Sequence, residues 1–398
     1  MSESLAVVRN LSQTPGSLLD LYQPESSVYF SSEKHALLAR PPFASLLVAG
    51  MKDLDQQVRE SLRLANELGF EKTVVVGAIP FDVNEKSYLR VSTNLLTENN
   101  RRSSSAANES IDIGHYSINS HPEPNEYING VKNALQRFDR GELDKVVLSR
   151  TLEIDCEHSP NVKTMVRNLA SKNAHGYTFA VNLKDIDNHS QDNRVHALIG
   201  ASPELLISRR GSKIIANPLA GSEPRSQDST IDRERAQRLL ASPKDRHEHA
   251  LVIQAIEKVL RPYCRTLHVP TEPSMISTEA MWHLSTRIEG ELKDPAASSL
   301  ALALALHPTP AVCGHPNEEA RNAIKQIEQH ERDLFTGMVG WCDNSGDGEW
   351  VVTIRCAEVE AKKIRLYAGA GIVEGSEPEK ELAETGAKFN TMLNAIGL

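Results

Sequence analysis

The stretch AGAGIVEGSEPEKELAETGAK at residues 368–388 joins a glycine-rich segment to the start of a helix. Glycines let a backbone adopt positive φ and approach a ligand closely. Ser376 is the predicted N-cap of the helix, and Glu379 stands three residues later, as a capping box requires. The free N–H groups and the positive dipole end at such a helix start can hold an anion. The stretch therefore predicts a glycine loop that leads into an anion-binding helix.

The charged residues of this helix share one face. Glu381, Glu384 and Lys388 stand at positions i, i+3 and i+7, which places them in one row directly after the glycine loop. Two carboxylates and one amine in this arrangement fit a site for a carboxylate ligand and a metal ion. The alternative is a solvated surface helix with ordinary acid–base pairs. The glycine loop in front of the charges favours the site.

Composition and charge exclude several classes of protein. The chain of 398 residues is 40% hydrophobic, so it can bury a large core. A formal charge of −9 and the absence of a lysine or arginine block argue against binding to nucleic acid or to an anionic membrane. The longest aliphatic run, residues 300–306, is too short to span a bilayer, and the first residues do not resemble a signal peptide. We therefore expect a cytoplasmic protein with a small-molecule ligand.

The cysteines do not suggest a disulfide framework or a zinc site. They are odd in number and scattered, and no two form a C-x-x-C pair. We interpret them as small buried hydrophobic residues: Cys156, Cys264, Cys313, Cys342 and Cys356.

Short apolar strands alternate with amphipathic helices along the chain, and the strands have the spacing of antiparallel sheets with helices on their faces. Residues 97–124 interrupt this pattern, because they are polar and include Arg-Arg-Ser-Ser-Ser at 101–105. Such a composition predicts a mobile connection. We therefore divide the chain into an N-terminal α/β part, residues 1–110, which ends in this connection, and a larger part, residues 111–398.

Two ionisable residues occur in apolar surroundings. Lys145 enters the strongly apolar strand of residues 144–154, where burial would favour a neutral amine that can act as a base. Glu204 lies between a tight turn and a new apolar strand, where a carboxyl group can have a raised pKa and act as a general acid. The alternative for Lys145 is a solvated lysine at a strand end.

A second helix start carries further acids. Ser242 is the predicted N-cap of a helix that places Asp245 and Glu248 on one face, at i and i+3. The alternative is that these acids only complement the helix dipole. The H-E-x-x-H pattern of a zinc site is absent, so zinc is not expected. His283, and the loop of residues 307–314 that contains Ala311, place polar groups in apolar surroundings, as ligand-lining segments do.

Taken together and in order, these motifs resemble the chorismate-utilising family, which includes isochorismate, salicylate, anthranilate and aminodeoxychorismate synthases. The likeness covers residues 125–398 and is strongest to siderophore-type isochorismate synthases. It implies an α/β fold of the α+β type, in which a single large domain contains two stacked antiparallel sheets with helices outside. The division near residue 110 would then lie within one fold. The matching motifs are KVVLSR, GASPELL, PLAGS, KDRHEH, WHL, HPTPA and GAGIVEGSEPEKELAETGAK.

The resemblance also implies roles for individual residues. Lys145 would activate water, and Glu204 would protonate the departing C4 hydroxyl of chorismate. Mg²⁺ would be the cofactor, held by acidic residues of the two helices: Glu248 and Glu384, with Glu381 and Asp245 close by. The two carboxylates of the substrate would be bound by two cations and three backbone N–H groups: those of Arg355, Lys388, Gly369, Ala370 and Gly371. His283 would lie near the ring.

Three positions distinguish members of the family. Aminodeoxychorismate synthases that use a nucleophilic lysine carry it where this chain has Ala220, so amination is not expected. Salicylate-forming relatives carry threonine and tyrosine where this chain has Ala311 and Phe335, which favours release of isochorismate.

We therefore expect a monomeric isochorismate synthase, most compatible with catechol siderophore biosynthesis, that binds chorismate and needs no glutaminase partner. The alternatives are a menaquinone-pathway isochorismate synthase, a salicylate synthase, an anthranilate-type lyase, and a binding protein without turnover.

Overall fold

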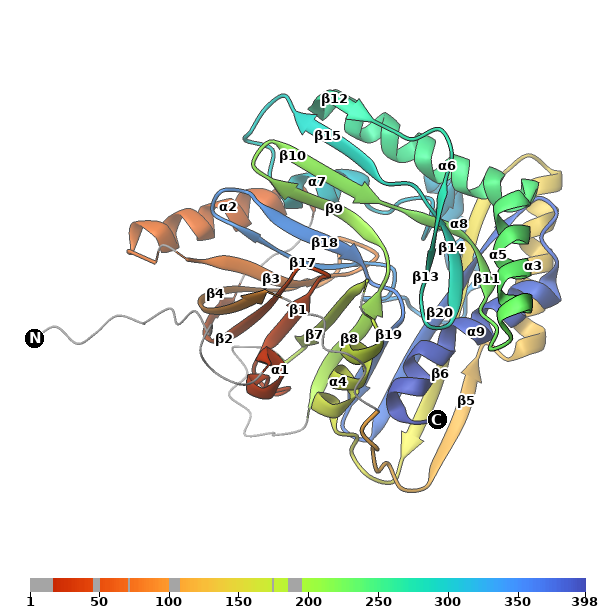
Figure 1. Cartoon of the computed structure of the whole chain (residues 1–398), viewed down its shortest axis with the longest axis horizontal. Coiled ribbons are helices and arrows are strands. Elements are labelled where there is room, and N and C mark those ends of the chain that lie inside the picture. Colours follow the sequence, from red (N-terminus) through yellow and green to blue (C-terminus); the bar gives the residue numbers. More distant parts are fainter. Residues whose placement is uncertain (1–16, 46–50, 71, 100–107, 174, 185–194) are drawn as a thin grey trace, which may run out of the picture.

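The strands of the protein pair antiparallel throughout the part of the chain that the computed structural model describes, residues 17–45, 51–70, 72–99, 108–173, 175–184 and 195–398 (Figure 1). Their bounds are β1 Val28–Ser31, β2 His35–Ser45, β3 Val74–Ile79, β4 Tyr88–Asn99, β5 Tyr116–His121, β6 Lys145–Cys156, β7 Tyr177–Asn182, β8 His196–Ser202, β9 Leu205–Arg210, β10 Lys213–Asn217, β11 Leu219–Pro224, β12 Cys264–His268, β13 Ser274–Ser277, β14 Met281–Ser285, β15 Ile288–Leu292, β16 Gly314–His315, β17 Met338–Asp343, β18 Gly348–Val352, β19 Cys356–Glu360 and β20 Lys363–Val373.

Hydrogen bonds link most of these strands into one continuous sheet, which bends so that two parts of it, here called arms, face each other. One arm runs through β5, β6, β20, β19, β8 and β7. The other runs through β3, β17, β18, β9, β10, β15 and β12. The strands β1, β2 and β4 join the two arms at one end, because β1 pairs with β7 and β4 pairs with β3.

The two arms enclose a shared apolar core. Side chains alternate between the faces of a strand, so one strand can serve two cores. On β3, Val74 and Val76 belong to the cluster between the arms, which also contains Phe179 of β7 and Val351 of β18. Val75 faces the other way, into a cluster beneath helices. The strands are therefore apolar on both faces, as in a two-layer sheet structure covered by helices.

The helices cover the outer faces of the arms. Figure 1 shows α9 running beside β20 and β6, with α3 and α4 packed against it, while α2 and α7 lie on the other arm. Among the described residues, no helix combines the length and the apolar content needed to cross a bilayer. The bounds are α1 Leu18–Leu21, α2 Met51–Glu67, α3 Pro124–Asp139, α4 Val162–Lys172, α5 Ser229–Ala241, α6 Pro243–Leu260, α7 Ser299–Leu306, α8 Asn317–Ile327 and α9 Pro378–Ile396.

A second sheet of three strands, in the order β11, β14, β13, stands apart from the large sheet. The helices α5 and α6 pack against its strand β11, and α9 contacts the same strand. The small sheet thus brings α6 and α9, the two helices with the predicted acidic faces, to one region of the molecule.

The predicted fold class, antiparallel sheets with helices outside in one domain, is confirmed, and all five cysteines are free and buried as expected. The expected polar connection needs correction. Residues 100–107 lie outside the described part of the chain, but residues 116–121 form β5, because their backbone pairs with β6.

The predicted glycine loop is wrong in its conformation. Gly369 and Gly371 lie within β20, paired opposite Ser149 and Val147 of β6, and the glycine with a left-handed backbone is Gly375, at φ +82°. The predicted N-cap is also wrong, since Glu377 occupies that position. The hydroxyl of Ser376 instead accepts a hydrogen bond from the Val373 N–H and closes the turn between β20 and α9.

Candidate active site

A cavity lies where β20, the small sheet, α6 and α9 meet. It is lined by most of the predicted site residues, although they come from segments far apart in the sequence. These lining residues are Glu204, Glu248, His283, Ala311, Phe335, Arg355, Gly369, Gly371, Glu384 and Lys388. The other predicted residues, Lys145, Asp245, Glu381 and Ala370, are not part of this lining, although Lys145 contacts the lining residue Glu248.

Lys145 is fully buried at the start of β6. Its Nζ is 2.9 Å from Oε1 of Glu248, which is itself buried on α6. Burial alone would raise the pKa of Glu248, but the charge of Lys145 outweighs burial and holds that pKa below its usual range. Gly371 makes room for this pair, because a Cβ on Gly371 would stand 2.1 Å from Glu248 Oε1.

Glu204 is buried in the turn between β8 and β9, with 3% of its surface exposed. Burial raises the pKa of Glu204 to about 7, although the Leu219 N–H and the positive charges of Lys145 and Arg355 oppose the rise. A carboxyl group with this pKa holds its proton for much of the time near neutral pH, so it can donate one.

The acids of α6 and α9 form an alternating cluster with lysines. Lys244 lies 2.8 Å from Glu381, and Lys388 lies 2.5 Å from Glu384. Burial raises the pKa of Glu381 to about 7, and the nearby charge of Glu384 adds to the rise. Glu381, at 2% exposure, and the nearly buried Lys388 show that the charged face of α9 turns inward, as predicted.

Asp245 belongs to the same cluster. Ser242 caps α6 as predicted, since its hydroxyl accepts a hydrogen bond from the Asp245 N–H at 3.2 Å. Burial, together with the charges of Glu248 and Glu384, raises the pKa of Asp245 to about 6, although the Ser242 contact and the charge of Lys244 oppose the rise. Within the described residues, no three His, Cys, Asp or Glu side chains converge closely enough to form a ready metal site. The cluster nevertheless contains one more carboxylate than lysines, because Asp245 adds to the three pairs Lys145–Glu248, Lys244–Glu381 and Lys388–Glu384.

The strand β20 presents an open edge to the cavity. Its pairing with β19 ends at Leu366, whereas its pairing with β6 continues to Val373. Lys388 Nζ donates to the Gly369 carbonyl at 2.8 Å, so the polar backbone groups of Gly369 point away from β6. Directions alternate along a strand, so the N–H groups of Gly369 and Gly371 share this edge, whereas that of Ala370 faces β6.

Arg355 and His283 form the opposite polar wall. Arg355 Nη2 lies 3.2 Å from His283 Nε2, and His283 Nδ1 lies 3.1 Å from the Ser222 hydroxyl. Burial and the charge of Arg355 hold the pKa of His283 well below its usual range, so the ring is neutral. Because a guanidinium can only donate, Nε2 accepts and Nδ1 carries the proton. Burial lowers the pKa of Arg355 to about 10, so it remains a cation near neutral pH.

Phe335 and Ala311 belong to the apolar part of the lining. The ring of Phe335 stacks on Tyr367 with their centroids 5.1 Å apart and an angle of 12° between the ring planes. No hydroxyl group is present at either position to hydrogen-bond a ligand.

Comparison with known proteins agrees with this geometry. The family model described as chorismate binding enzyme matches residues 71–397. The chain belongs to the chorismate-binding enzyme family. The resemblance drawn from the motifs is therefore confirmed.

Individual relatives of this chorismate-binding enzyme are similar over nearly their whole length. Isochorismate synthase DhbC of Bacillus subtilis is 48% identical, covering 96% of each chain. The vibriobactin-specific isochorismate synthase of Vibrio cholerae is 42% identical, covering 96% of this chain and 94% of the relative. The crystal structure of Bacillus anthracis DhbC, assigned as a 2,3-dihydroxybenzoate-specific isochorismate synthase, superimposes with a TM-score of 0.90 at 48% identity, over 96% of this chain and 99% of that one.

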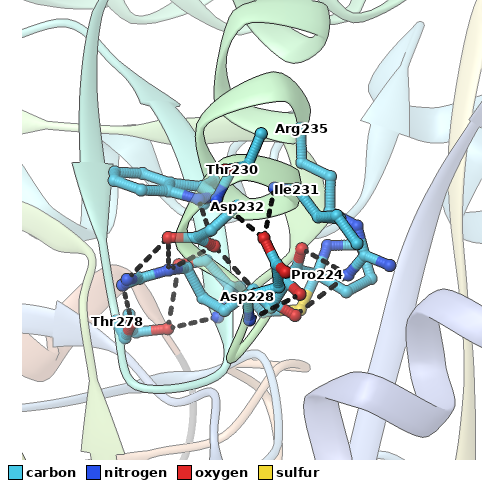
Figure 2. Close-up of polar contacts among 11 residues, drawn as sticks. Pro224, Asp228, Thr230, Ile231, Asp232, Arg235 and Thr278 are labelled. Atoms are coloured by element: carbon cyan, nitrogen blue, oxygen red, sulfur yellow. Dashed lines mark hydrogen bonds and ion pairs between the residues drawn. The ribbon is translucent and has the colours of Figure 1, made fainter.

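The small sheet of this chorismate-binding enzyme is anchored on its outer side by Asp232 of α5. Figure 2 shows Asp232 among its polar contacts, where its carboxylate accepts from Arg225, from the Ser226 N–H and from Trp282 Nε1 at 2.9–3.0 Å. The Arg225 guanidinium also lies over the Trp282 ring, 4.4 Å from its centroid. Trp282 and His283 are neighbours on β14, so they point to opposite faces and the anchor fixes the strand that carries His283.

Several residues of the site were not predicted from the sequence. Ser222, Thr336 and Tyr367 line the cavity, and Lys244 pairs with Glu381. Ser222 ends the PLAGS motif, and Lys244 begins KDRHEH, so motif membership was an available signal for both. Thr336 and Tyr367 follow apolar residues in ordinary sequence surroundings, and only the tertiary structure brings them to the cavity.

We expect the Asp232 anchor to make stability depend on pH. The hydrogen bonds and charge of Arg225 lower the pKa of Asp232 to about 2, below the value of about 3.9 for an unfolded chain. Its contribution to folding is therefore complete above the unfolded value and is lost as pH falls toward 2. Asp232→Asn should lower the free energy of unfolding near neutral pH, and the difference from wild type should shrink below about pH 4.

Urea unfolding of the wild type and Asp232→Asn at several pH values measures this difference. Asp139→Asn, at an exposed helix end, is the matched control. A difference that stays constant between neutral and acidic pH would contradict the assignment.

Proposed function

We propose that this chain is an isochorismate synthase that converts chorismate to isochorismate by adding water at C2 and removing the C4 hydroxyl. The observation that carries the proposal is a buried amine, Lys145, and a buried carboxyl group with a pKa of about 7, Glu204, at the cavity of a chorismate-binding enzyme. The names and the high identity of the similar proteins support the same activity.

Lys145 and Glu204 are the proposed base and acid. In its neutral form Lys145 accepts a proton from the water that attacks C2, and in its protonated form Glu204 gives a proton to the hydroxyl that leaves C4. One water is consumed and one is released, so the reaction is an isomerisation. Lys145 contacts Glu248, and Glu248 and Glu204 line the same cavity, which supports the action of both groups on one ring.

The carboxylates of the substrate explain the cations of the cavity. Chorismate carries two negative charges, whereas the chain itself has a formal charge of −9. Arg355, Lys388 and the N–H groups of Gly369 and Gly371 would bind the two carboxylates by charge-assisted hydrogen bonds. His283, neutral and oriented by Ser222 and Arg355, would contact the ring.

Mg²⁺ is the proposed cofactor, and the donor chemistry fits it. Mg²⁺ prefers carboxylate and water oxygens, which the acids of α6 and α9 provide. Glu248 and Glu384 would hold the ion, with Glu381 and Asp245 close by; the raised pKa values of the last two indicate buried carboxylates that a cation would stabilise. When bound, the ion would neutralise the ring carboxylate and withdraw electron density from the carbon that water attacks.

Other features favour one member of the family and one pathway. Ala220 at the cavity offers no nucleophilic amine, and Ala311 and Phe335 offer no hydroxyl to promote loss of pyruvate. The vibriobactin and 2,3-dihydroxybenzoate names of relatives support a catechol siderophore pathway over a menaquinone pathway.

We further propose that the enzyme works in the cytoplasm as a monomer without a glutaminase partner. All cavity residues lie between Val147 and Lys388, which supports residues 111–398 as the chorismate-binding region and residues 1–110 as an N-terminal part.

Product analysis by chromatography tests the activity. The protein is incubated with chorismate and Mg²⁺, with and without an ammonia source. Isochorismate as the main product supports the proposal. Salicylate with pyruvate, an aminated ring, or unchanged chorismate would each overturn it, and would indicate a salicylate synthase, an anthranilate-type lyase or a binding protein.

The metal prediction concerns Glu384. Glu384→Gln should weaken both Mg²⁺ and chorismate binding, because it removes one hard anionic ligand and leaves the ring carboxylate poorly neutralised. Calorimetric titration with Mg²⁺ measures the first effect, and KM measures the second. Glu379→Gln, on the exposed face of the same helix, removes the same charge and should change neither. Full turnover after exhaustive chelation would contradict the metal requirement.

The choice between releasing isochorismate and losing pyruvate should depend on the apolar lining. Ala311→Thr, alone or with Phe335→Tyr, should raise pyruvate release relative to isochorismate, because hydroxyl groups can then orient the side chain of the substrate for elimination. A tenfold change needs only about 1.4 kcal/mol in relative barriers. Phe389→Tyr adds a hydroxyl to a buried ring that does not line the cavity, so it should leave the ratio of products unchanged. A constant ratio in all variants would contradict the prediction.

The acid and base should affect turnover more than affinity. Lys145→Ala and Glu204→Ala should each lower kcat by roughly 10²–10⁴-fold, the usual contribution of a positioned acid or base, with a much smaller change in KM. In the wild type, kcat should fall as pH rises above about 7, because Glu204 then loses the proton that it donates. Glu358→Ala removes a partly buried carboxylate that does not line the cavity, and it is the control. A variant that loses only affinity would show that the residue is a binding group.

A further inference from the structure

The guanidinium group of Arg332 lies buried behind the cavity wall and uses all of its hydrogen-bond donors. Arginine has five N–H groups. Nε and Nη2 donate to the two oxygens of Glu328 at 2.8 and 2.6 Å, and Nη2 also donates to the Val147 carbonyl at 2.7 Å. Nη1 donates to the Val312 carbonyl at 2.8 Å and to the Thr336 hydroxyl at 3.3 Å. The side chain is 3% exposed, as is that of Glu328.

Three of these acceptors belong to residues that line the cavity. Val147 lies on β6, Val312 lies in the loop after α7, and Thr336 lies in the turn before β17. One planar group therefore fixes the relative positions of three chain segments that are distant in the sequence. A lysine could reach only part of this set, because its charge is a single point without a rigid fork.

The segments that Arg332 joins carry Ala311 and Phe335, the two residues proposed to decide between isochorismate and loss of pyruvate. Ala311 directly precedes Val312, and Phe335 directly precedes Thr336. The Phe335 N–H also donates to the Arg332 carbonyl at 2.7 Å. The turn is unusual in backbone shape, since Asp333 and Thr336 have φ values of +46° and +59°. Such conformations cost free energy and persist only where the surroundings hold them.

Glu328 extends the network to the substrate-binding strand. Its Oε1 accepts from the N–H and the hydroxyl of Ser149, at 2.7 and 2.8 Å. Ser149 on β6 pairs opposite Gly369 on β20. The Arg332 guanidinium also lies 4.7 Å from the centroid of the Phe81 ring, which covers its face.

We propose that Arg332 is a positioning residue that holds Ala311 and Phe335 in the geometry that ends the reaction at isochorismate. This inference rests on the proposed function. A buried ion pair is by itself a weak source of stability, because desolvation of the charges offsets their attraction. The contacts of Arg332 are instead directed at the backbone of the cavity wall, where a shift of about 1 Å can cost two orders of magnitude in rate.

The test compares Arg332→Lys with Arg209→Lys. Arg209 is also buried, at 3% exposure, and donates to the carbonyls of Ser345 and Pro295 and to Asp347, all outside the cavity. The measurements are thermal stability, kcat, KM and the ratio of pyruvate to isochorismate. Arg332→Lys should lower kcat at least roughly tenfold, change KM less, and raise the share of pyruvate. Arg209→Lys should lower thermal stability without changing the product ratio.

Glu328→Gln is the second variant, and it decides the matter if Arg332→Lys does not fold. It keeps one carbonyl oxygen for the guanidinium and for Ser149, so the same changes in kcat and product ratio should occur with smaller size. Wild-type kcat and product ratio in the variants that fold, or changes equal to those of Arg209→Lys, would overturn the positioning role. Failure of the proposed function is a separate result, because the wild type would then not release isochorismate in the same assay.

Discussion

The burial of Lys145 beside Glu248 is the constraint on which the site depends. A charge without solvent access must be paired, and breaking such a pair leaves an uncompensated buried charge. The pair joins β6 to α6, so the helix must dock against the large sheet at this point. Gly371 of β20 must lack a side chain for the two groups to meet. Three elements are thereby held in one arrangement around a buried amine.

Opposite charges are paired directly in and around the cavity. Carboxylates of α6 and α9 alternate with Lys145, Lys244 and Lys388, whereas Arg355 stands with the neutral His283 on another wall. Burial acts differently on each group: it raises the pKa of Glu204 and lowers that of His283. The same low-dielectric surroundings thus supply a proton donor, a neutral ring and a set of fixed charges. This explains how an acidic protein can bind a dianionic substrate.

Sequence reasoning identified the acids of α6 and α9 and the buried Lys145, because spacing along a helix and polarity within an apolar strand are local properties. It was wrong on the glycine segment. Glycine permits a loop, but the adjacent residues Ile372 and Val373 pair with β6, and the extended ladder determines the conformation. It was also wrong on Ser376, since Glu377 directly precedes the first helical residue, Pro378. Helix ends depend on where the preceding strand turns.

The sequence by itself determined the composition of the site: the acids on helix faces, the lysine in an apolar strand, the absence of hydroxyl groups at Ala311 and Phe335, and the family to which these motifs point. Only the tertiary structure decided which groups meet. Ser222 reaches His283 on the neighbouring strand of the small sheet, and Arg332 joins the carbonyls of Val312, 20 residues away, and of Val147, 185 residues away. Such contacts have no local pattern, because they depend on the packing of both sheets and of the helices around them. Spacing along the chain determines which side chains share one face of a helix or strand. The distances between side chains of different segments are determined by the fold.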